Sequence, residues 1–153
     1  MRIFNGTPGY GISLNEDEIV EFLSKTKSNL QLATLDKKDE PNIHPVWFIY
    51  EKGLLYVSTE KNSKKIKNIL RKNTVYFSID EDNSEFKGVR GKGTAKILED
   101  IDFNVIITEK IVKKYAGSLD GKLAKEVMDE MKNGIEVVLE ITPKFYSSWI
   151  FTL

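Results

Sequence analysis

The turn near residue 60 carries the side chains best suited to chemistry in this sequence. Thr59, Ser63, Lys64 and Lys65 place two hydroxyls and two ammonium groups where a helix is expected to begin. The start of a helix offers unpaired backbone N–H groups and a partial positive charge, so it attracts anions. These residues therefore form a candidate site for a phosphate group. The alternative is a solvated helix face, which is the usual role of a run of charges.

A second candidate is the segment His44-Pro45-Val46-Trp47, which lies in an aromatic and β-branched run. Proline cannot donate to a strand ladder, so we expect an edge strand or a bulge at Pro45. Such a place leaves neighbouring backbone N–H and C=O groups free to bind a planar heterocycle, with Trp47 as one wall of the site. The alternative is that Trp47 belongs to the core and that His44 is a satisfied surface residue.

The composition argues against several classes of function. Lys and Arg together number 23, as do Asp and Glu, so the formal net charge is zero and no surface-wide nucleic-acid site is expected. Basic residues on the helix after Ser63 could contact a phosphate backbone, but the acidic block Asp80-Glu81-Asp82 follows closely. The absence of cysteine excludes thiolate metal sites, disulfides and Cys nucleophiles. A single histidine, His44, argues against a His-rich metal site.

The expected setting is a soluble, cytoplasmic protein. No stretch of the chain approaches the roughly 18 apolar residues that a membrane span requires. The first ten residues contain Asn5, Gly6, Pro8 and Gly9 rather than the apolar run of a signal peptide. The length of 153 residues is that of one ordinary domain, which we expect to span residues 1–153.

Hydrophobic patterning predicts about seven strands and four short helices. Asn15 and Glu18 form a capping-box pattern at the start of the first helix. Ile43–Tyr50 and Leu54–Thr59 are expected to pair as a hairpin. The other predicted elements are strands at Leu30–Leu35, Thr74–Asp80, Phe86–Leu98, Ile135–Ile141 and Phe145–Leu153, and helices at Lys61–Lys72, Ile101–Tyr115 and Leu119–Lys132. Because hairpin connections dominate, we expect a mainly β domain: a small antiparallel barrel with short helices at its rim.

Two glycine-containing stretches are interpreted as structural. Residues 1–12 contain three glycines and a proline and are expected to be an irregular lead-in. Gly88, Gly91 and Gly93 interrupt a strand pattern rather than a strand-to-helix turn, so they predict a bulge or a close backbone approach instead of a phosphate-binding loop.

The order of these segments resembles the pyridoxamine 5′-phosphate oxidase-related family, the FMN-binding split β-barrels. The matching features are a PVWF-like strand, a following strand that ends at Thr59, and the helix start SKKIKN at residues 63–68. The closing segment ITPKFYSSWIF is similar to the ending of family members. The resemblance extends from about Leu30 to Trp149, and it rests on the order and spacing of the motifs together.

The resemblance implies a homodimer that binds FMN, or in one branch a deazaflavin coenzyme, in a groove between the subunits. The implied cofactor-binding residues are Thr59, Ser63, Lys64, Lys65, Asn68, His44, Pro45, Val46, Trp47 and Trp149. By position, the residues from Thr59 to Asn68 correspond to the family's phosphate-binding group. The backbone from His44 to Trp47 corresponds to the segment along the isoalloxazine ring, and Trp149 is expected near the flavin, from the partner subunit.

The sequence departs from the family pattern at its end. True pyridoxamine 5′-phosphate oxidases end in a segment whose arginine and histidine grip pyridoxal phosphate, whereas residues 147–153 contain neither type. We therefore expect flavin binding without oxidation of pyridoxamine 5′-phosphate.

The expected function is an FMN-dependent oxidoreductase that acts on a small-molecule substrate or electron donor. Neither a nucleic acid nor a membrane is expected as a partner. The sequence marks no side chain as a general acid or base. Two alternatives stay open: a reductase that uses a deazaflavin coenzyme, and a flavin-binding module without turnover.

Overall fold

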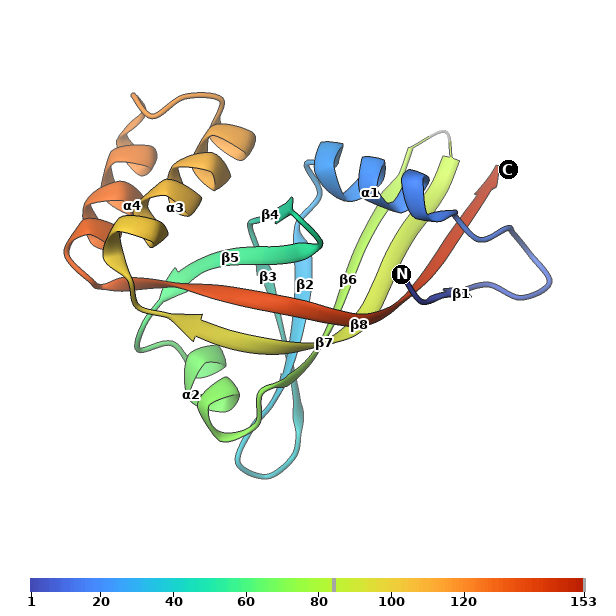
Figure 1. The fold of residues 1–153 in the computed structure, drawn as a ribbon, viewed down its shortest axis with the longest axis horizontal. Coiled ribbons are helices and arrows are strands. Elements are labelled where there is room, and N and C mark those ends of the chain that lie inside the picture. Colours follow the sequence, from blue (N-terminus) through green and yellow to red (C-terminus); the bar gives the residue numbers. More distant parts are fainter. Residues whose placement is uncertain (84, 153) are drawn as a thin grey trace.

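A computed structural model describes residues 1–83 and 85–152 of the chain. Figure 1 shows a long curled sheet with helices along its margins. The elements are β1 (Ile3–Asn5), α1 (Glu16–Lys25), β2 (Leu30–Leu35), β3 (Pro41–Val46), β4 (Phe48–Glu51), β5 (Leu54–Glu60), α2 (Lys64–Arg71), β6 (Thr74–Asp82), β7 (Glu85–Leu98), α3 (Ile101–Ala116), α4 (Lys122–Lys132) and β8 (Glu136–Thr152).

All strands of the described chain belong to one sheet. Its main path runs β3-β2-β6-β7-β8-β5-β4, and every pairing along that path is antiparallel. The two ends of the path, β3 and β4, are consecutive in the chain, so the sheet must curl to bring its edges together. The result is a mainly β half-barrel with helices at its rim, which confirms the predicted fold class.

The strand predicted at Ile43–Tyr50 is wrong as a single element. The chain leaves the ladder at Trp47, so that β3 pairs with β2 and β4 pairs with β5. Only the second half therefore forms the predicted hairpin. Pro45 lies on the edge strand β3, as expected for a residue that cannot donate to a ladder. Trp47 marks the point where the chain crosses from one edge of the sheet to the other.

Two further differences concern the ends of the chain. The strands predicted on either side of Pro143 form one continuous strand, β8. Lys92 of β7 pairs with Phe145 and Gly93 pairs with Pro143, so Lys144 is an extra residue on β8. This β-bulge lies next to Pro143, which lacks a backbone N–H. The expected irregular lead-in contains β1, which pairs in parallel with β8 at Tyr146–Ser148.

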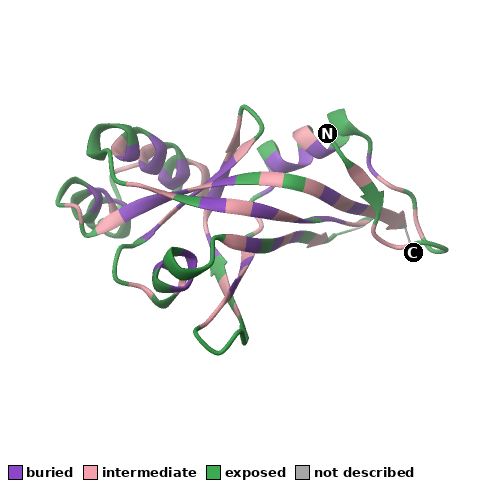
Figure 2. Ribbon diagram, turned by 60° about the horizontal axis from the view of Figure 1, so that its bottom comes forward, coloured by how far each residue is buried: buried purple, intermediate pink, exposed green. Residues whose placement is uncertain are grey.

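The described residues form three hydrophobic clusters, two of which lie on opposite faces of β5 and β8. Leu55, Val57 and Leu139 are fully buried inside the barrel, whereas Tyr56 and Val138 point the other way and pack under α3. Figure 2 shows the resulting bands of buried and exposed positions along the strands. The ends of β5 and β8 nearest the α3–α4 pair are thus covered on both faces, which fixes the position of side chains there.

The glycines of β7 allow close approaches, as the sequence predicts. A Cβ at Gly91 would overlap the carbonyl oxygen of Phe145, and a Cβ at Gly88 would overlap the ring of Trp149. These two positions therefore hold β7 against β8 and serve a structural purpose.

The predicted capping box is also present. The Asn15 side chain accepts a hydrogen bond from the backbone N–H of Glu18, and the Glu18 carboxylate accepts one from the N–H of Asn15.

Within the described residues, no helix combines the length and the apolar character needed to span a membrane.

Candidate functional site

The start of α2 has the features of an anion site. Ser63 is the N-cap residue, with extended backbone, and its hydroxyl is buried without a hydrogen-bond partner in the described part of the chain. That hydroxyl does not cap the helix, and the first turn carries Lys64 and Lys65 instead of an acidic residue. A buried hydroxyl and uncapped N–H groups are both stabilised by an anion placed beside them.

Lys65 is turned back toward the end of β5. Its Nζ lies 2.8 Å from Oγ1 of Thr59, to which it donates a hydrogen bond, and Thr59 itself is buried. Burial lowers the pKa of Lys65, while the nearby carboxylates of Glu60 and Glu136 act in the opposite direction. A partly desolvated ammonium gains strongly from an anionic ligand, because fewer water molecules solvate its charge.

Thr59 and Lys65 line a pocket of about 360 Å³ at the junction of α2, β5, β8 and the α3–α4 pair, whereas Ser63 is not among its lining residues. Of the predicted residues, it brings together Pro45, Val46, Trp47, Thr59 and Lys65. Its other lining residues are Ser58, Glu60, Thr108, Ile111, Val112, Val127 and Glu136. The pocket therefore combines one cation, two carboxylates and several hydroxyls with an apolar wall, and Lys65 is the group in it that suits an organic phosphate.

Trp47 has both of the roles that the sequence left open. Its ring stacks on Tyr115 of α3, with centroids 4.9 Å apart and planes within 2°, and its side chain also lines the pocket. The Tyr115 hydroxyl donates to the carbonyl of Ser28, 3.0 Å away, and burial raises the pKa of that phenol to about 12. The indole is thus held from one side by a fixed aromatic neighbour.

His44 lies beside α2 but does not line the pocket. Its Nε2 is buried with no partner among the residues that the structure describes. Burial lowers the pKa of His44, and the charges of Lys65 and Lys64 lower it further. The imidazole is therefore neutral at pH 7.

Two further predicted phosphate-binding residues, Lys64 and Asn68, do not line this pocket. Asn68 is buried and donates a hydrogen bond of 3.0 Å to Oγ1 of Thr34, so its amide joins α2 to β2. Lys64 and Asn68 line a separate hollow of about 410 Å³ on the other side of α2. The other residues of this hollow are Asp36, Lys37, Lys38, Glu40, Lys67 and Arg71.

Trp149 is remote from the pocket within one chain. Thr59 pairs with Val137, and Trp149 follows 12 residues later on the same strand, roughly 40 Å away along β8. Its ring covers Gly88, and the Arg90 guanidinium carbon lies 5.5 Å from the ring centroid. The expected contact with the flavin from a partner subunit stays a prediction.

Sequence reasoning missed a polar group in the same pocket. Glu136, the first residue of β8, accepts a hydrogen bond from the Ser58 hydroxyl, and Oγ1 of Thr108 on α3 lies 3.3 Å from that hydroxyl. Burial raises the pKa of Glu136 above its usual range. The sequence carries no local sign of this group, because its members are separated by tens of residues and meet only through strand pairing.

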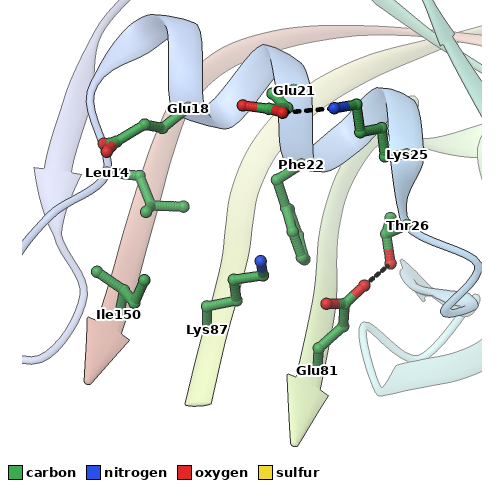
Figure 3. Close-up of a pocket in the computed structure, with 9 residues that line it drawn as sticks. All are labelled: Leu14, Glu18, Glu21, Phe22, Lys25, Thr26, Glu81, Lys87 and Ile150. Carbon is green, nitrogen blue, oxygen red and sulfur yellow. Dashed lines mark hydrogen bonds and ion pairs between the residues drawn. The ribbon is translucent and has the colours of Figure 1, made fainter. Parts of the chain in front are cut away.

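Another hollow lies between α1 and the strands β6, β7 and β8 and contains none of the predicted residues (Figure 3). Most of its polar groups already have partners: Lys25 pairs with Glu21, the Thr26 hydroxyl donates to Glu81, and Glu18 accepts from the backbone of Asn15. The Nζ of Lys87 lies 5.8 Å from the ring centroid of Phe22. This hollow is therefore a less suitable ligand site than the pocket at Lys65.

The fold defines a split β-barrel protein, with a candidate anion site at the start of α2. The sequence profile of pyridoxamine 5′-phosphate oxidase matches residues 16–149, and the chain belongs to this family. No curated protein matches the chain.

Solved structures share the fold over most of their length. The conserved hypothetical protein Rv2991 from Mycobacterium tuberculosis has a TM-score of 0.77 at 23% identity, covering 94% of this chain and 88% of its own. An FAD-binding protein from Mesorhizobium loti has a TM-score of 0.69 at 19% identity, covering 92% and 98%. An F420 reductase has a TM-score of 0.62 at 21% identity, covering 83% and 94%.

Proposed function

We propose that the chain is a flavoprotein that binds FMN and acts as an oxidoreductase on a small molecule. The observation that carries this proposal is the pairing of Lys65 with Thr59 near the end of β5, together with the buried Ser63 hydroxyl at the start of α2, which has no partner among the described residues. These groups fit a phosphate monoester, which offers three acceptor oxygens and up to two negative charges. Membership of the family and the likeness to an FAD-binding protein support a flavin as the rest of the ligand.

Each part of the pocket has a distinct task in this proposal. Lys65, Thr59 and Ser63 would hold the phosphate, while the backbone from Pro45 to Trp47 would run along the ring system. The isoalloxazine, when bound, supplies the hydride and electron transfer. The protein orients the ring and excludes water from one side through the wall that α3 and α4 form.

A deazaflavin coenzyme is the second candidate, and one observation favours it. The hollow on the far side of α2 carries Lys37, Lys38, Lys64, Lys67 and Arg71 against Asp36 and Glu40. Such an excess of cations suits a cofactor with a polyanionic tail. The structural likeness to an F420 reductase supports the same possibility.

The absorption spectrum of the purified protein distinguishes these candidates. We expect the bands of oxidised flavin, which a nicotinamide donor bleaches under anaerobic conditions and an added acceptor restores. A deazaflavin spectrum would replace FMN by the second candidate. Bound flavin that no nicotinamide donor or acceptor changes would indicate a binding module without turnover.

We also propose that the protein is a homodimer. A row of outward-facing side chains crosses the sheet, in the register Ile43, Ala33, Tyr76, Lys92 and Phe145. The ring of Phe4 packs against that of Phe145, with centroids 5.5 Å apart. Ile43 is 66% exposed and Tyr76 is 50% exposed, although both are apolar or aromatic. Burial of such a row in a two-fold interface removes apolar surface from water.

Light scattering at micromolar concentration is expected to give twice the chain mass of 17.5 kDa. Introducing a charge into the row, as in Tyr76→Glu, is expected to shift the mass toward that of one chain. A wild-type mass of 17.5 kDa would contradict the dimer and any flavin site that two subunits share.

A further inference from the structure

Glu136 and Lys65 face the same pocket with opposite charges. Glu136 is held in place by the hydroxyl of Ser58, which itself lies 3.3 Å from the Thr108 hydroxyl. This fixed carboxyl group is therefore close enough to Lys65 for each charge to affect the other.

The surroundings of Glu136 oppose its ionisation on balance. Burial raises its pKa, and the negative charges of Glu130 on α4 and Glu60 on β5 raise it further. Glu60 is the direct cross-strand partner of Glu136. The hydrogen bond from Ser58 and the charge of Lys65 on α2 act in the opposite direction. The part of α3 that reaches this group is the uncharged Thr108.

We infer that Glu136 is a positioning residue that sets the affinity of the pocket for an anion, by acting on Lys65. In its protonated form, Glu136 leaves the Lys65 ammonium free to bind a phosphate. In its ionised form, it attracts Lys65 and repels the phosphate in the same pocket. This inference rests on the proposed function, because it assumes that the anion at Lys65 is the phosphate of the flavin.

The direction of the pH effect follows from this arrangement. A bound phosphate raises the pKa of Glu136 further, so binding is accompanied by uptake of a proton. The contribution of Glu136 therefore weakens FMN binding as pH rises through its pKa in the free protein. The second ionisation of the FMN phosphate, near pH 6, acts in the opposite direction. Only a comparison between variants therefore isolates the effect of Glu136.

The Glu136→Gln variant provides that comparison, because its amide oxygen can still accept from Ser58. At pH 8.5 we expect it to bind FMN about five-fold more tightly than the wild type, as one unit charge a few ångströms away at high effective dielectric implies. The difference between the two proteins should narrow as pH falls and Glu136 becomes protonated. Glu140→Gln is the matched control: Glu140 lies on the same strand and accepts from Tyr56, but it does not line the pocket.

A titration of the free protein tests the coupling without any flavin. Carboxyl-carbon NMR is expected to show Glu136 ionising above the usual range of a glutamate, and at still higher pH in Lys65→Met, where the neighbouring cation is lost. A Glu136 titration that Lys65→Met leaves unchanged would overturn the inference. Parallel pH profiles of FMN binding for the wild type and Glu136→Gln would also overturn it, while leaving the proposed function intact. A wild type that binds no FMN at any pH would instead overturn the proposed function.

Discussion

Replacing Lys65 with alanine is expected to weaken FMN binding by about 10- to 100-fold. The Lys65 ammonium donates a hydrogen bond to Thr59 in the pocket, and burial has already removed part of its hydration. A charge-assisted hydrogen bond of this kind contributes roughly 1.5–3 kcal/mol, and every 1.4 kcal/mol is a factor of about ten in the dissociation constant. Titration of cofactor-free protein with FMN, followed by flavin fluorescence, measures the loss.

Lys67→Ala is the matched control for this experiment. It removes the same charge from the same helix, but Lys67 is exposed and lines the hollow on the far side of α2. Its loss should change the FMN dissociation constant by less than about three-fold, since exposed charges are screened by solvent and salt. Thermal unfolding of both variants verifies that they are folded. Equal effects of the two substitutions would show that only the general charge of α2 matters.

The FMN-loaded protein is expected to form no pyridoxal 5′-phosphate at enzyme-like rates. Pyridoxamine 5′-phosphate is itself a phosphate ester, so its oxidation requires a second anion site beside the flavin. The three arginines of the chain are each engaged elsewhere. Arg71 donates to the carbonyl of Leu35, and the guanidinium of Arg2 lies over the ring of Phe4. Arg90 lies over Trp149 and donates to the carbonyl of Gly6.

An assay for pyridoxal 5′-phosphate with the fully loaded protein measures this activity. The flavin content, determined by absorbance in the same sample, ensures that a negative result does not reflect missing cofactor. Turnover on the order of 1 per second or faster would contradict the prediction. It would also mean that a cation such as Arg90 leaves its present contacts to bind the substrate phosphate.

The local features of the fold could be predicted from the sequence, whereas its long-range features could not. The capping box at Asn15 and the edge position of Pro45 follow from the chemistry of single residues, and both are present. The crossing at Trp47 could not be predicted, because a residue there has the same aromatic, β-branched neighbours whether the strand continues or changes its partner. The parallel pairing of β1 depends on contacts with the far end of the chain, so residues 1–12 give no local signal of it.

In the candidate site, too, the local features could be predicted from the sequence and the long-range ones could not. The contact between Thr59 and Lys65 joins a strand end to the next helix, and short connections of this kind are visible in the spacing of residues. The motif places Asn68 with the phosphate-binding residues, but its amide donates a hydrogen bond to Thr34 of β2 instead. Glu136 was not predicted because its environment is created by Ser58 and Thr108, which belong to two other elements.

The crystal structure of the protein with FMN tests the central claim most directly. We expect the phosphate to lie at the start of α2, within hydrogen-bond distance of Lys65 Nζ and of the Thr59 and Ser63 hydroxyls. The isoalloxazine ring is expected along the backbone from Pro45 to Trp47. A phosphate bound instead among Lys64, Lys67 and Arg71 on the far side of α2, or beside α1, would contradict the account.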